Sequence, residues 1–272
     1  MEHGTIREAV RDRYTTIAED GSTCCAPSCC GSDESASVST VMGYDEDQLH
    51  SVPEGADLGL GSGNPVAAAD LQEGETVLDL GSGGGIDCFL AADKVGPTGQ
   101  VIGVDMTAGM IARARKNAKA GSYPNVDFRL GEIEALPVAD STVDVIISNC
   151  VINLSPERDR VLAEALRVLK PGGRLVISDL VCRAPIPTTL REEAEAVTSC
   201  LPVEEHEYLG DLEAAGFTDV RVTNARPYPR EAMSSEPLAR KILEEHPEIA
   251  ESLEEFASSV NGAIIEARKP IE

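Results

Sequence analysis

The chain has 272 residues, of which 42% are hydrophobic but only 3% aromatic, and it contains no tryptophan. Its 47 acidic and 23 basic residues give a formal net charge of -24, and a surface of that sign repels nucleic acids and anionic membranes. No apolar run approaches the ~20 residues of a membrane-spanning helix, and the polar start lacks the apolar stretch of a signal peptide. We therefore expect a cytoplasmic protein with neither a nucleic-acid nor a membrane partner.

Strands and helices alternate through most of the chain. Residues 1–20 predict a charged helix, and the small, polar, Cys-rich residues 21–40 predict a mobile loop. Apolar runs then predict strands at 76–80, 100–105, 126–131, 143–149 and 174–180, separated by helical patterns at 85–95, 107–120 and 157–169. Near-continuous apolar strands that alternate with helices indicate an α/β fold, in which a parallel sheet is covered on both faces.

Beyond residue 181 the alternation is less regular. Helices are predicted at 187–199, 204–215 and 236–246, and strands at 218–225 and 260–267. We divide the chain into a flexible Cys-rich segment (1–40), an α/β core (41–180) and a C-terminal region (181–272) that completes the sheet and covers the site.

The most informative motif is ETVLDLGSGGG at 75–85. An apolar strand carries Asp79, and glycines follow at alternate positions, Gly81, Gly83 and Gly85, before a helix begins. Glycine lets the backbone turn sharply and approach a ligand closely, and the helix start offers free N–H groups to an anion. The dinucleotide fingerprint GxGxxG would need a glycine at 86, where this chain has Ile86.

This spacing instead resembles the first motif of class I S-adenosylmethionine-dependent methyltransferases. VIGVD (101–105), RLGEIEALP (129–137), SNCVINL (148–154) and LKPGGRLVISD (169–179) resemble the motifs that follow it. The resemblance implies a Rossmann-like fold with a mainly parallel seven-stranded sheet, closed by an antiparallel pair of strands. It also implies S-adenosylmethionine as cofactor, with the hydroxyls of the ribose on Asp105. The implied cofactor-binding residues are Asp79, Gly81, Ser82, Gly83, Gly85, Asp105, Met106, Gly131, Glu132, Ile133 and Asn149.

Eight cysteines in a chain expected to be cytosolic favour metal, metalloid or redox chemistry over structural disulfides. Cys88 lies on the first turn of the helix after the glycine loop, and Cys150 ends the fourth strand. Both are expected near the ligand, because strand C-termini face the cleft of a parallel sheet. Cys182 is expected to be a small core residue. The remaining cysteines are Cys24, Cys25, Cys29, Cys30 and Cys200.

Four segments resemble arsenite methyltransferases: LGSGGGIDCF (80–89), VIGVDMTAGM (101–110), SNCVINLSPE (148–157) and CLPVEEHEYLGDLEAAGF (200–217). The resemblance implies that Cys150 and Cys200 bind As(III), a thiophilic substrate, and that Cys88 takes part in a thiol relay during turnover. It further implies arsenite and methylarsenicals as substrates, and an external thiol reductant such as thioredoxin or a small thiol.

One position departs from this family. Ser62 stands where its members commonly have a further cysteine, which leaves the disulfide partner of Cys88 open. The N-terminal pairs Cys24–Cys25 and Cys29–Cys30 could substitute by folding over the cleft, could capture arsenic and pass it inward, or could bind soft metals adventitiously.

Thiol-bound arsenic has a lone pair that can attack the sulfonium methyl without a general base, and the four histidines lie outside the segments that build the cleft. Two alternatives stay open. A methyltransferase for a small organic substrate, such as a quinone or sterol precursor, would keep its activity without Cys150. A non-catalytic module that sequesters or senses arsenic would bind the metalloid without consuming S-adenosylmethionine.

An acidic surface poor in lysine is typical of proteins from salt-loving organisms, because salt screens the repulsion between like charges. Only 6 of the 23 basic residues are lysines. We expect the midpoint of thermal unfolding to rise on addition of molar KCl. A midpoint that does not rise would contradict this origin.

Overall fold

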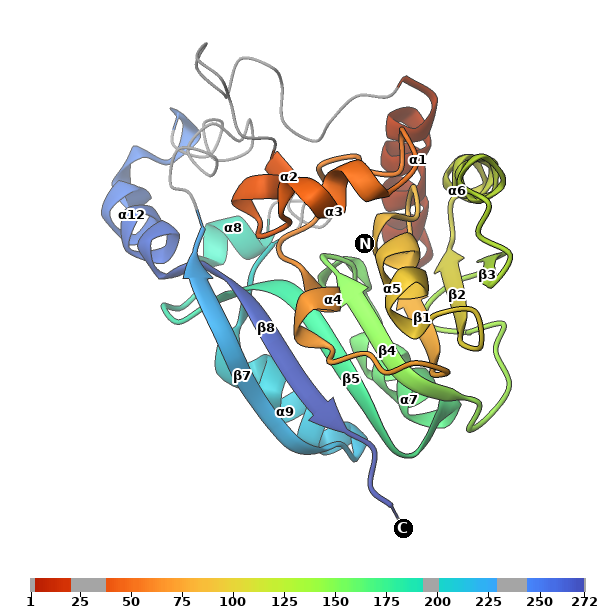
Figure 1. Ribbon diagram of the computed structural model, residues 1–272. Coiled ribbons are helices and arrows are strands. Elements are labelled where there is room, and N and C mark those ends of the chain that lie inside the picture. Colours follow the sequence, from red (N-terminus) through yellow and green to blue (C-terminus); the bar gives the residue numbers. More distant parts are fainter. Residues whose placement is uncertain (1–2, 21–37, 193–200, 229–243, 272) are drawn as a thin grey trace.

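An eight-stranded mixed sheet runs through the computed structural model, which describes residues 3–20, 38–192, 201–228 and 244–271 (Figure 1). The strands lie in the order β3-β2-β1-β4-β5-β8-β7, and the two-residue β6 pairs with β5 off this path. β1 to β6 pair in parallel, whereas β8 runs antiparallel to both of its neighbours. The strands are β1 (Thr76–Leu80), β2 (Gln100–Asp105), β3 (Val126–Leu130), β4 (Val143–Asn149), β5 (Leu169–Cys182), β6 (Val203–Glu204), β7 (Thr218–Pro227) and β8 (Asn261–Arg268).

Helices cover both faces of the sheet. The apolar side chains of α7 and α9 belong to one buried cluster with Leu78 and Leu80 of β1, whereas those of α5 and α6 belong to a second cluster with Val77. Alternate residues of a strand thus serve two separate apolar layers, which explains the near-continuous apolar runs in the sequence. The helices are α1 (His3–Asp20), α2 (Val38–Val41), α3 (Glu46–Ser51), α4 (Pro65–Ala68), α5 (Ile86–Val95), α6 (Ala108–Gly121), α7 (Arg158–Val168), α8 (Thr188–Glu192), α9 (Glu205–Ala215) and α12 (Ala250–Ser259), with the 3-10 turns η2 (Ile152–Leu154) and η4 (Pro247–Ile249). Among the described helices, none combines the length and apolar character needed to cross a bilayer.

The predicted α/β fold is confirmed, and β1, β2 and β4 have the predicted bounds. β5 is longer than predicted, because Leu169 already pairs with Val143 of β4 ahead of a register shift. The expected seven strands form the continuous order, and β6 is an unpredicted eighth. Its two residues form a short ladder with Val181 and Cys182 of β5.

The C-terminal antiparallel pair is also confirmed, as β7 and β8. α8 occupies only the start of the helix predicted at 187–199, and residues 193–200 lie outside the described residues. The loop predicted at 21–40 and the helix predicted at 236–246 also lie mostly outside them, although α2 begins at Val38. The division of the chain at residues 40 and 180 stays a prediction.

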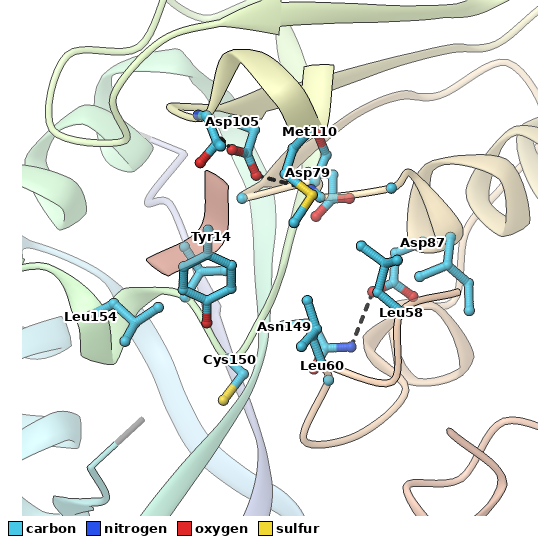
Figure 2. A pocket seen from close by; sticks show the side chains of 18 of the residues that line it. Tyr14, Leu58, Leu60, Asp79, Asp87, Asp105, Met110, Asn149, Cys150 and Leu154 are labelled. Carbon is cyan, nitrogen blue, oxygen red and sulfur yellow. Dashed lines mark hydrogen bonds between the residues drawn. The ribbon is translucent and has the colours of Figure 1, made fainter. Parts of the chain in front are cut away.

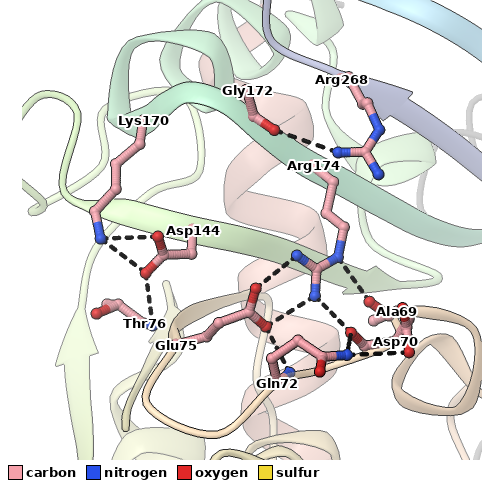
Figure 3. Close-up of polar contacts among 10 residues, drawn as sticks. All are labelled: Ala69, Asp70, Gln72, Glu75, Thr76, Asp144, Lys170, Gly172, Arg174 and Arg268. Atoms are coloured by element: carbon pink, nitrogen blue, oxygen red, sulfur yellow. Dashed lines mark hydrogen bonds and ion pairs between the residues drawn. The ribbon is translucent and has the colours of Figure 1, made fainter.

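Arg174 joins the amino-terminal end of β1 to β5 (Figure 3). Its guanidinium donates to both carboxylate oxygens of Glu75, at 2.7 and 2.8 Å, and to the carbonyl oxygens of Ala69 and Asp70, at 2.7 and 2.9 Å. Burial by itself would raise the pKa of Glu75, but the hydrogen bonds from Arg174 and from the Gln72 N–H outweigh it and lower that pKa. One planar cation therefore fixes the turn that leads into the central strand.

We expect Arg174→Lys to lower the free energy of unfolding by about 1–3 kcal/mol, because an ammonium cannot reproduce the forked contact with Glu75. The matched control is Arg221→Lys, which changes an arginine that pairs with Glu266 while being 58% exposed. An exposed pair contributes little, about 0–1 kcal/mol. Urea unfolding of both variants checks this, and equal losses would contradict the role given to Arg174.

Candidate functional site

A cavity opens at the carboxyl ends of the parallel strands, where the strand order reverses between β1 and β4 (Figure 2). This is the place where open α/β sheets bind ligands, because neighbouring connections leave in opposite directions there. Of the residues predicted to bind the cofactor, nine line the cavity: Asp79, Gly81, Ser82, Gly83, Asp105, Met106, Gly131, Ile133 and Asn149. Gly85 and Glu132 are not among its lining residues.

The glycine loop approaches the cavity closely because its backbone adopts conformations that favour glycine. Gly81 has φ +69°, and a Cβ there would lie 2.4 Å from Val151. Gly83 has φ +49°, and a Cβ there would have no atom within 4 Å. Between them, the Ser82 hydroxyl oxygen is buried without a hydrogen-bond partner among the described residues. The loop therefore presents open space and an unsatisfied polar group to a ligand.

Asp105 ends β2 beside this loop. Its two carboxylate oxygens accept the N–H groups of Gly83 at 3.0 Å and Thr107 at 2.8 Å. Burial raises the pKa of Asp105, although these two hydrogen bonds favour the charged form. The carboxylate is thus held in one orientation, and its remaining lone pairs can accept further hydrogen bonds.

A second group of polar residues closes the other end of the cavity. Tyr44 donates to Asp87 at 2.7 Å, and the Asn149 amide nitrogen lies 2.8 Å from the Tyr44 hydroxyl and 3.1 Å from Asp87. The Asn149 amide oxygen accepts the N–H of Ser62 at 2.9 Å, and its nitrogen also reaches the carbonyl oxygen of Gly63. The amide of Asn149 is therefore occupied by protein groups, although the residue lines the cavity.

Two buried carboxylates, Asp79 and Asp87, lie on the cavity wall. Burial raises the pKa of Asp87 to about 6, against the hydrogen bonds from Tyr44 and Asn149, which lower it. Burial and the nearby charge of Asp87 also raise the pKa of Asp79. Neither carboxylate has an ion pair with a described cationic side chain, so a cationic ligand group would be favoured at this end of the cavity.

Cys150 lies on the cavity wall directly after β4 (Figure 2). Its backbone is in the left-handed region, with φ +58°, and its N–H donates to the carbonyl oxygen of Ser178 at 2.8 Å. A non-glycine residue in that region is strained, which is common at functional sites. Cys150 is disulfide-bonded, and neither Cys88 nor Cys182 is its partner, because both are free thiols.

The other cysteines are not brought to the cavity among the described residues. Cys88 is fully buried behind the glycine loop, where its thiol lies 3.2 Å from Asp79. Cys182 is buried in the apolar cluster formed with α8 and α12, as expected for a core residue. The predicted roles of Cys24, Cys25, Cys29, Cys30 and Cys200 fall outside the described residues.

The contribution of α1 to the cavity was not predicted from the sequence. Arg7, Val10 and Tyr14 line the cavity, and Figure 2 shows the Tyr14 ring among its side chains. Two ion pairs of 2.8 Å hold the helix in place, between Arg7 and Glu157 and between Arg11 and Glu132. Helical spacing of apolar residues predicted the helix, but spacing alone does not reveal where a helix docks.

Asp87 and Tyr44 were also missed. An acidic residue in the otherwise apolar first turn of α5 is a sequence signal that could have identified Asp87. Tyr44 carries no comparable signal, because its partner is 43 residues away in the sequence.

We expect Tyr44→Phe to lower the free energy of unfolding by about 1–3 kcal/mol, because the ring still fits but Asp87 loses a buried hydrogen-bond donor. Thermal unfolding measures the loss. Tyr123→Phe is the control, since its longer hydrogen bonds, of 3.4 and 3.5 Å, are exposed. Equal stabilities of the Tyr44 variant and the parent would refute this account of the cluster.

Comparison with known proteins adds to this geometry. Residues 71–231 match the family described as a methyltransferase domain. An arsenite methyltransferase from Halobacterium salinarum is 51% identical over 229 residues, which cover 79% of this chain and 58% of that protein. An arsenite methyltransferase from Aquipseudomonas alcaligenes is 37% identical over 248 residues, which cover 87% of this chain and 68% of that protein.

A solved structure agrees with these relatives. The crystal structure of an arsenic (III) S-adenosylmethionine methyltransferase from Chlamydomonas reinhardtii superposes with a TM-score of 0.63 at 31% identity, covering 88% of this chain and 74% of that one. The chain spans 58% of the length of the halobacterial relative. Matched by a methyltransferase domain over more than half its length and by these relatives, the chain belongs to the arsenite methyltransferase family.

Proposed function

We propose that this protein transfers methyl groups from S-adenosylmethionine to trivalent arsenic held by its own cysteine thiolates. The observation that carries the proposal is the position of Cys150, which lies on the same cavity wall as the glycine loop and Asp105. A soft sulfur ligand thus adjoins the cofactor region, as the methylation of a thiophilic metalloid requires.

The cavity fits the proposed cofactor. The Gly81–Gly83 turn and the unsatisfied Ser82 hydroxyl suit the methionine part, while Asp105 suits the ribose hydroxyls. Asp79 and Asp87 offer a negative region to the cationic groups. When bound, S-adenosylmethionine supplies an electrophilic methyl group on a positively charged sulfur.

The residues around the cavity suit a reaction that needs no general base. None of the four histidines lines it. Asp87 is occupied by Tyr44 and Asn149, and Asp105 by two backbone N–H groups. The protein's contribution is therefore to orient the two reactants and to exclude water, the latter helped by α1.

Arsenic binding requires the Cys150 thiolate, so the disulfide of Cys150 must first be reduced. Reduction takes two electrons and two protons, which an external dithiol such as thioredoxin, or two small thiols, would supply. We propose Cys200 as the second arsenic ligand, with the pairs Cys24–Cys25 and Cys29–Cys30 as further arsenic-binding thiols. A reducing, cytoplasmic compartment is consistent with this requirement.

The test incubates the protein with arsenite, S-adenosylmethionine and a dithiol in high KCl, and separates the arsenic species. We expect methylated arsenic from the parent and a loss of at least about 100-fold for Cys150→Ser, because a hydroxyl is a poor ligand for a soft metalloid. The matched control is Cys182→Ser, which changes a buried thiol outside the cavity.

Other outcomes separate the alternatives. Full activity of Cys150→Ser would place the arsenic ligands elsewhere. Cofactor binding without any methylated arsenic would point to a small organic acceptor, and arsenic binding without consumption of S-adenosylmethionine would point to a sequestering protein.

A further inference from the structure

Cys88 lies in the first turn of α5, directly after the glycine loop, and is not among the residues that line the cavity. Its side chain is fully buried in the apolar cluster that contains Phe89 and Phe128. A Cβ on Gly103 of β2 would lie 2.8 Å from the Cys88 sulfur, so the thiol packs directly on the backbone of that strand. Neither another cysteine nor a reductant can approach this sulfur without displacing α5 or β2, because disulfide exchange needs access to it.

The partner of this thiol is Asp79, a residue of the cavity wall. The Cys88 sulfur lies 3.2 Å from one carboxylate oxygen, a contact in which only the thiol can donate when the carboxyl is charged. Among the described residues, Cys88 is the side chain that donates a hydrogen bond to Asp79. Asp79 is itself buried, with 3% of its surface exposed.

Electrostatics agree with this direction of donation. Burial and the adjacent charge of Asp79 raise the pKa of Cys88, so its thiol keeps its proton. Burial and Asp87 raise the pKa of Asp79, whereas the hydrogen bond from Cys88 lowers it. A protonated thiol is a poor nucleophile and a poor metalloid ligand, but it can donate a hydrogen bond to the Asp79 carboxylate.

We propose that Cys88 is a positioning residue for cofactor binding: its S–H holds the Asp79 carboxylate charged and oriented toward the cationic methionine end of S-adenosylmethionine. Cys88 then has no place in the redox cycle of the arsenic-binding thiols, in contrast to the relay that the family resemblance implied. The inference rests on the proposed cofactor, and not on the identity of the methyl acceptor.

The test compares Cys88→Ser, which keeps a donor, with Cys88→Ala, which removes it. Binding of S-adenosylmethionine is titrated by calorimetry between pH 5 and 8. We expect the dissociation constant of the Ser variant to stay within about threefold of the parent, and that of the Ala variant to rise about tenfold. Without the donor Asp79 protonates more readily, so as pH falls the Ala variant should lose affinity at a higher pH than the parent.

Cys182→Ser and Cys182→Ala are the controls, because Cys182 is also a free, buried thiol but lies in a different cluster. They should leave the dissociation constant unchanged. Equal affinities of the Cys88 Ser and Ala variants would overturn the proposal. The same preparations are assayed for methylated arsenic, so that normal cofactor binding without methylation counts against the proposed acceptor alone.

A measurement on the unsubstituted protein covers the case in which Cys88→Ala does not fold. The protein is first reduced and the excess reductant removed. After a single turnover with arsenite and S-adenosylmethionine, free thiols are alkylated under denaturing conditions and mapped by mass spectrometry. We expect Cys88 to be recovered as an alkylated free thiol. Its recovery in a disulfide would establish the relay and refute the positioning role.

Discussion

Between β1 and β4 the direction in which successive strands join the sheet reverses, and the site depends on this reversal. The connections after the two strands leave in opposite directions, so their carboxyl ends stay uncovered by the sheet's own helices. Gly81 follows β1 and Cys150 follows β4, and the two come to the same cavity although they are far apart in the sequence. α1 and the segment around Tyr44 then complete the walls.

Much of the fold was predictable, because local patterns specify it. Apolar runs that end before Gly81, at Asp105 and at Asn149 predicted β1, β2 and β4 with their bounds, and the alternating glycines predicted the loop that shapes the cavity. Residues of the site were predictable only where a short sequence motif by itself determines the local backbone conformation. Gly85 illustrates the limit: a Cβ there would lie 2.8 Å from Phe128, so it serves the packing of α5 and not the cavity wall. The sequence shows a glycine at this position, but not whether it is needed for the cavity wall or for the packing of α5.

Contacts between distant segments account for the rest. Tyr44 and Asn149 are 105 residues apart, and their hydrogen bond arises only when the chain after α2 folds across the end of β4. The direction in which the Cys88 side chain points also depends on distant segments of the chain. The first turn of a helix has one face toward the ligand and one toward the sheet. The packing of Phe128 and Gly103 decides between them. Cys88, which the sequence suggested for a thiol relay, therefore lies in the interior with its sulfur 3.2 Å from Asp79, and its role stays a prediction.

The place of β8 has a consequence for how the chain assembles during synthesis. β8 lies between β5 and β7, yet it follows both in the sequence. When β7 leaves the ribosome it has no partner in the sheet, and the edge of β5 that β8 will occupy is still open. Open strand edges are templates for pairing with other chains. The nascent protein must therefore remain soluble with an incomplete sheet until Asn261–Arg268 has been made, and its abundant negative charge, which discourages self-association, serves that interval.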